Sequence, residues 1–111
     1  MHNKSIKYDK LIRDKIPEVI RKNGNEAVVE ILDDERFKKY LDNKLAEEMN
    51  EYLESGSVEE LADLVEVVYA LLEYNNVSLE QFEKIRNDKT QARGAFKKRL
   101  LLKEVIIRIE D

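Results

Sequence analysis

Very few residues in this chain interrupt a helix, and this scarcity restricts the possible folds more than any other feature. One proline and three glycines occur among 111 residues, and these two residue types are the most costly inside a helix. Long helices are therefore the default expectation. We expect one domain over residues 1–111, because two separate cores would each be too small to outweigh the entropy of ordering them.

The few breakers mark the first two expected helices. Pro17 suits a first helical turn and Gly24 suits a left-handed helix end, which predicts a helix over about 15–23. Asp33 is well placed to cap a much longer helix, which runs to the break at 54–56. The second helix is thus expected to be the longest of the chain.

Two further helices are expected from their capping boxes. A serine followed three residues later by Glu or Gln, as at Ser57 and Ser78, is typical of a helix start. The third helix is expected to end near 74–76 and the fourth near Gly94. The short break before Ser57 makes the second and third helices antiparallel neighbours.

Two apolar segments predict a small β element. Residues 27–32 are brief and β-branched, and residues 97–103 are rich in Leu, so the second segment is expected to pair with the first. The pattern leaves the last eight residues open. The expected fold is mainly α, an antiparallel bundle of four helices with a two-stranded β element.

Composition excludes several classes of function. The absence of cysteine excludes disulfides, thiolate zinc sites and cysteine nucleophiles, and the single histidine, His2, excludes serine-type triads and two-histidine metal centres. The net charge of -4 argues against nucleic-acid binding. No apolar run suits a membrane span or a signal peptide, so we expect a cytoplasmic protein with no nucleic-acid or membrane partner.

Acidic residues lie inside the apolar stripes of the second and third helices. With about 100° per residue, Glu48 falls among the apolar positions of its helix and Glu51 lies at their edge. Glu60 and Asp63 repeat the arrangement on the next helix. The remaining acids of the two helices are expected to face solvent: Glu47, Glu54, Glu59, Glu66 and Glu73.

Four carboxylates on one seam call for a cation, because each buried carboxylate costs several kcal/mol unless it is paired. Ligation by oxygen alone favours Mg²⁺, with Mn²⁺ as a substitute, and neither helix carries the histidine that a di-iron site would use. Two alternatives remain open. Glu60 can be the reciprocal member of the Ser57 capping box, and Glu48 can pair with Lys44 one turn back.

Basic residues complement the acids. Arg86, Lys89 and Arg93 share one face of the fourth helix and are candidates for binding phosphate. The alternative is a solvated face paired with Glu83 and Asp88.

Basic residues near the start of the chain are further candidates. Lys10 and Arg13, together with Lys44, are expected to contact substrate, and Lys15 adds charge nearby. The alternative is that these side chains pair with neighbouring acids or helix ends.

These residues carry a family resemblance. Glu48-x-x-Glu51 followed by Glu60-x-x-Asp63 resembles the metal-binding signature of the MazG-like all-α nucleoside triphosphate pyrophosphohydrolases. The opening segment YDKLIRDKIPE, residues 8–18, resembles the start of a small branch of house-cleaning pyrophosphatases from bacteria, archaea and phages.

The resemblance extends over residues 8–102 and has two departures. Lys89 and the segment 93–96 match the branch, but Ala95 stands where a second glycine is common. The loop between the acid pairs is also short, which leaves little chain to form a base pocket.

The resemblance implies Mg²⁺-dependent hydrolysis of nucleoside triphosphates, including modified ones, between the α and β phosphates. It implies that Glu48, Glu51, Glu60 and Asp63 hold the metal and that Glu48 orients the attacking water. It also implies a homodimer or a dimer of dimers. The alternatives are a phosphoribosyl-ATP pyrophosphohydrolase, to which the opening motif is foreign, and a non-catalytic helical interaction module.

Overall fold

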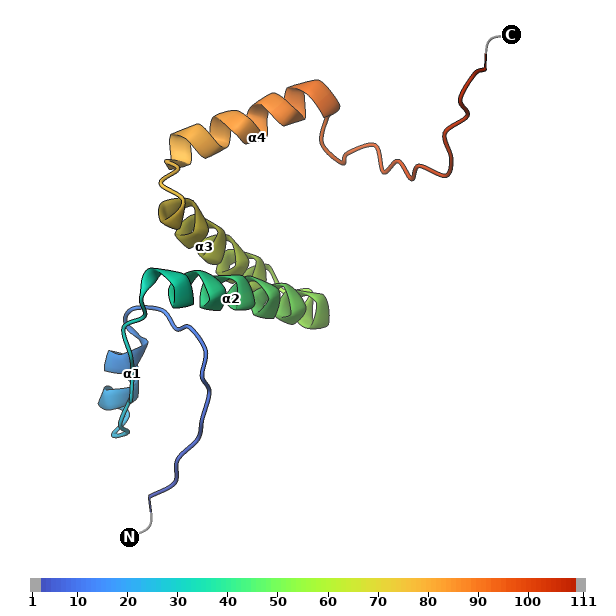
Figure 1. Cartoon of the computed structure of the whole chain (residues 1–111). Helices are drawn as coiled ribbons and strands as arrows, with labels where there is room; N and C mark the ends of the chain where they lie inside the picture. Colours follow the sequence, from blue (N-terminus) through green and yellow to red (C-terminus); the bar gives the residue numbers. More distant parts are fainter. Residues whose placement is uncertain (1–2, 110–111) are drawn as a thin grey trace. The chain divides into compact units, whose positions relative to one another are not determined.

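The computed structural model describes residues 3–109, and its regular structure is entirely helical (Figure 1). Its helices are α1 (Ile16–Lys22), α2 (Asp34–Ser55), α3 (Val58–Tyr74) and α4 (Leu79–Arg93). The expected mainly α class and the four expected helices are confirmed. Their bounds differ from the predicted ones by one or two residues, which is the usual uncertainty at helix ends.

The chain divides into two compact units, one up to Leu79 and the other from Glu80 on. The first unit contains α1, α2 and α3, and the second contains nearly all of α4. His2 and residues 110–111 lie outside the described residues. None of the helices in the described part combines the length and apolar character needed to cross a lipid bilayer.

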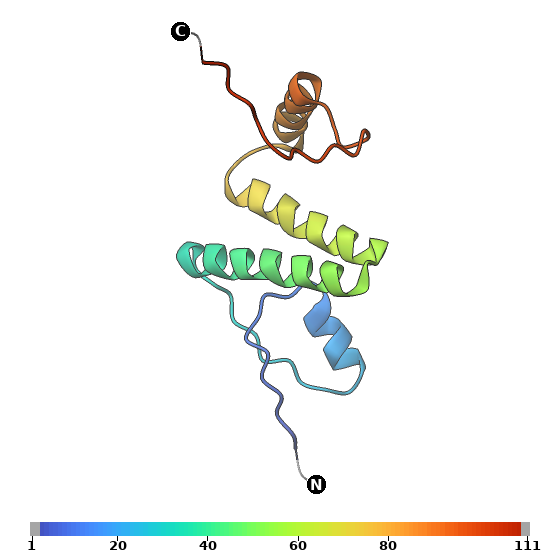
Figure 2. The same cartoon turned by 90° about the vertical axis from the view of Figure 1, so that its right-hand side faces the viewer.

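Helices α2 and α3 form an antiparallel hairpin, and they lie side by side in both views (Figures 1 and 2). Asp33 caps the start of α2, and Gly56 ends that helix with a positive φ of 65°, a conformation that suits glycine. Ser57 caps α3 immediately afterwards. At the other end of the hairpin, the rings of Phe37 and Tyr74 meet edge to face with centroids 6.1 Å apart.

The seam of this hairpin holds the buried side chains. In the described part of the chain they are Leu41 at 1% exposure, Val67 at 8% and Glu48 at 6%. The apolar stripe of α2 packs against the apolar stripe of α3. A carboxylate therefore belongs to the core that joins α2 to α3.

The predicted two-stranded β element is wrong for the described residues. Neither 27–32 nor 97–103 forms a strand, and residues 104–109 also have no regular structure. The side chains of Val28 and Leu100 are 98% and 86% exposed. β-branched residues favour a strand only when a second strand and an apolar layer cover them, and two isolated strands are marginal in water.

Candidate metal centre

The structure brings the four predicted acids together on the α2–α3 seam. Together with Glu47 they form two groups, and within each group one carboxylate oxygen per residue lies within 4.8 Å of the others. Glu48 joins Glu47 and Glu51 in one group, and it joins Glu60 and Asp63 in the other. The arrangement is thus two overlapping triads that share Glu48.

The turn at Gly56 explains this convergence. Glu48 precedes Gly56 by eight residues and Asp63 follows it by seven. Because the two helices run antiparallel and rise equally per residue, these positions reach the same level of the hairpin. The apolar stripe then turns both acids toward the neighbouring helix.

Glu48 is the most buried of these acids, and its two carboxylate oxygens differ in their contacts. Its Oε1 lies 3.3 Å from the Lys44 Nζ, so the expected alternative pairing is present. Its Oε2 is buried and has no hydrogen-bond partner in the described part of the chain. Burial is the main cause that raises the pKa of Glu48; Lys44 lowers it in part, and the neighbouring Glu51 raises it further.

Glu60 is in a similar position, because the predicted capping box does not form. The Ser57 hydroxyl accepts from the Glu59 backbone N–H at 3.1 Å, while the Ser57 N–H donates to Ser55 Oγ at 3.1 Å. Glu60 is therefore not the reciprocal partner of Ser57. Its Oε2 is buried and has no hydrogen-bond partner among residues 3–109.

Basic side chains of the opening segment contact the acids directly. The Lys10 Nζ lies 2.9 Å from Glu47 Oε1, and the Arg13 Nη2 lies 2.6 Å from Asp63 Oδ1. This is the pairing with neighbouring acids that the sequence left open as the alternative. Lys10 and Arg13 therefore stand beside the carboxylates rather than apart from them.

Glu47 was missed by the sequence analysis, which placed it on the solvent side. Its side chain is 26% exposed and pairs with both Lys10 and Lys44. Burial alone would raise the pKa of Glu47, but these two cations outweigh it and hold the pKa below its usual value. A helical projection contains no signal for this contact, because the opening segment covers that side of α2 only in the folded chain.

The three basic residues predicted on the fourth helix all lie on α4, in the unit from Glu80 on. The Arg86 Nη2 lies 2.7 Å from Glu83 Oε2, which agrees with the solvated-face alternative for this residue. Lys89 and Arg93 are exposed, and no ion pair involves them in the described part of the chain. These two cations therefore remain available for an anionic ligand.

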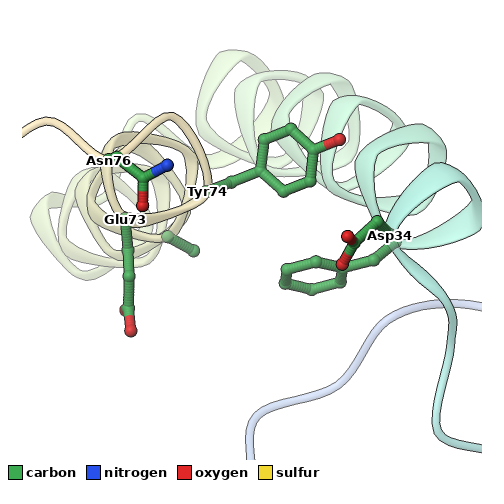
Figure 3. A pocket seen from close by; sticks show the side chains of 6 residues that line it. Asp34, Glu73, Tyr74 and Asn76 are labelled. Atoms are coloured by element: carbon green, nitrogen blue, oxygen red, sulfur yellow. The ribbon is translucent and has the colours of Figure 1, made fainter.

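A separate pocket of about 550 Å³ opens at the far end of the hairpin (Figure 3). Asp34 begins α2 there, about 20 Å along the helix from Glu48 at 1.5 Å per residue. The pocket is lined by Asp34, Phe37, Ala70, Glu73, Tyr74 and Asn76. None of the predicted site residues contributes to it.

Comparisons of the chain with protein-family models, with curated proteins and with solved structures found no match.

We predict that Glu48→Gln stabilises the metal-free protein near neutral pH by roughly 1 kcal/mol, the scale for relieving one poorly paired buried group. The native state holds the Glu48 proton more tightly than the unfolded chain does, so stability falls as pH rises from about 4.3 through the raised pKa. The gain from Glu48→Gln should therefore be complete above the raised pKa and absent below about pH 4.

Urea unfolding in the presence of a chelator, followed by circular dichroism at several pH values, measures this difference. Glu54→Gln on the exposed side of α2 is the matched control and should change the stability little at neutral pH. A Glu48→Gln variant that is less stable than the wild type at neutral pH would contradict the prediction.

Proposed function

We propose that Glu48, Glu51, Glu60 and Asp63 bind Mg²⁺, with Mn²⁺ as a substitute, and that the chain hydrolyses nucleoside triphosphates between the α and β phosphates. The products are the nucleoside monophosphate and pyrophosphate. The observation that supports metal binding is a pair of buried oxygens on facing helices, Glu48 Oε2 and Glu60 Oε2, which have no hydrogen-bond partner within residues 3–109. Burying such oxygens is unfavourable unless a cation or a hydrogen-bond donor contacts them.

The balance of charge supports a divalent ion. Among the described residues, five carboxylates meet at the seam, and Lys10, Arg13 and Lys44 supply three positive charges in direct contact with them. Two negative charges remain, which one divalent cation neutralises. The donors are all carboxylate oxygens, the ligands that Mg²⁺ and Mn²⁺ prefer.

When bound, Mg²⁺ would supply charge neutralisation at the phosphates and a lowered pKa for water. Glu48 is proposed to orient the attacking water, because its carboxylate belongs to both triads and its Oε1 also lies beside Lys44. Lys10, Arg13 and Lys44 stand beside the acids and offer donors to phosphate oxygens. Arg86, Lys89 and Arg93 lie on α4 in the other unit, and their role as phosphate-binding residues stays a prediction from the sequence.

The reaction itself is supported by the sequence resemblance. The opening segment over 8–18 and the two acid pairs together favour cleavage that releases pyrophosphate over cleavage that releases orthophosphate. The folded chain supports this association, because the opening segment contacts Glu47 and Asp63 through Lys10 and Arg13. The motif and the acids thus belong to one structural unit.

We predict that the protein with Mg²⁺ converts at least one member of a panel of ordinary and modified nucleoside triphosphates to monophosphate and pyrophosphate. Product analysis that separates pyrophosphate from orthophosphate measures the reaction. Asp63→Asn should reduce the rate by at least about 100-fold, while Glu66→Gln, on the exposed side of α3, should leave it unchanged.

The other outcomes of the panel are equally informative. Release of orthophosphate contradicts the proposed bond cleavage. Turnover of phosphoribosyl-ATP, assayed beside the panel, without turnover of any panel member identifies the second enzyme class. The absence of turnover together with the absence of metal binding leaves the non-catalytic helical module.

We predict that the wild-type protein binds Mn²⁺ stoichiometrically and that Mn²⁺ raises its melting temperature, since a ligand held only by the native state stabilises that state. Glu60→Gln should weaken this binding by at least about tenfold, because it removes one charged ligand from the seam. Isothermal titration at fixed ionic strength measures the affinity. Glu66→Gln is again the matched control, and equal affinities for the two variants would contradict the assignment.

We also propose that the functional form is a homodimer or a dimer of dimers. Beyond Leu41 and Val67, many apolar side chains of α2 and α3 are exposed, among them Met49 at 48%, Leu53 at 69% and Val65 at 43%. A second copy would cover such side chains and add to a small core. Light scattering should therefore give a mass of at least twice 13.1 kDa, and a monomeric mass at micromolar concentration would contradict the proposal.

A further inference from the structure

The opening segment is attached to both helices of the hairpin by one ion pair each. Lys10 reaches Glu47 on α2, and Arg13 reaches Asp63 on α3. The second contact is the shorter, with 2.6 Å between the Arg13 Nη2 and Asp63 Oδ1. It involves one carboxylate oxygen of a residue that also belongs to the triad with Glu48 and Glu60.

We infer that Arg13 is a positioning residue that orients the Asp63 carboxylate for metal binding. This inference rests on the proposed metal site. A hydrogen bond to Oδ1 restricts rotation of the carboxylate about its last side-chain bond, and it leaves Oδ2 to serve as the ligand atom. Removing a residue that holds a metal ligand in this way typically lowers the metal affinity by about 10- to 100-fold.

The positive charge of Arg13 acts in the opposite direction, because it repels a divalent ion. The Arg13 and Asp63 side chains are 56% and 42% exposed, so solvent screens this repulsion strongly. Interactions between charges at such sites change an affinity by only about two- to fivefold. Orientation is therefore the larger effect, and losing Arg13 should weaken metal binding.

The balance of charge agrees with a guanidinium that stays in place. The five carboxylates and the three cations in contact with them, Arg13 included, leave two negative charges. One divalent ion completes neutrality without displacing Arg13. If the Arg13 guanidinium instead occupied the position of the metal ion, it would have to leave when the ion binds.

The test is the Mn²⁺ affinity of the full-length, metal-free protein, measured by isothermal titration at fixed pH and ionic strength. Arg13→Gln should bind Mn²⁺ about tenfold more weakly than the wild type. Arg13→Lys keeps one charged donor and should recover part of this loss. Lys38→Gln removes a cation from another 2.6 Å ion pair, with Asp42 on α2, and should stay within about twofold of the wild type.

The possible results separate this inference from the proposed function. If the wild type binds Mn²⁺ and folded Arg13→Gln binds it equally or more tightly, the inference is overturned and the metal site stands. If the wild type binds no Mn²⁺, the metal site fails and the inference fails with it.

Circular dichroism and urea unfolding of the metal-free variants provide the folding control. If Arg13→Gln does not fold, Arg13→Lys decides the question: weaker binding than the wild type supports the inference, and unchanged binding overturns it.

Discussion

The half-satisfied carboxylate of Glu48 is the constraint on which the first unit depends. It lies in the seam between α2 and α3 at 6% exposure, beside the apolar core formed by Leu41 and Val67. Burying a charge is unfavourable unless partners compensate it. In the part of the chain that the structure describes, Lys44 compensates one of the two Glu48 oxygens and the other has no partner. The hairpin therefore buries an incompletely paired charge in its core. The other acidic and basic side chains of the site surround this charge.

The opening segment is part of this arrangement. Without Lys10 and Arg13, four further carboxylates would face Glu48 with Lys44 as the only cation in contact with them among the described residues. The two ion pairs reduce the excess to two negative charges, and one divalent ion balances that charge. This also explains why Glu47 and Glu48 respond differently to burial: two cations hold the pKa of Glu47 low, whereas the pKa of Glu48 is raised.

Local signals in the sequence were sufficient for the helices but not for the β element. Pro17, Asp33, Gly56 and Ser57 act on their own neighbours, so their effects can be read without knowing the rest of the fold. A strand needs a partner and an apolar layer that are distant in sequence. Residues 27–32 and 97–103 have the composition of strands but no such partner in the described structure, and their apolar side chains remain exposed.

The sequence by itself determined that Glu48, Glu51, Glu60 and Asp63 would meet, because helical periodicity and a tight turn at Gly56 are local properties. Tertiary structure decided the rest. It divided the acids into two triads that share Glu48, excluded Glu60 from the capping box, and added Glu47 to the seam. It also brought Arg13 to Asp63, fifty residues later in the chain. Contacts between distant segments depend on how a folded chain covers its own helices, and no periodicity within one helix contains that information.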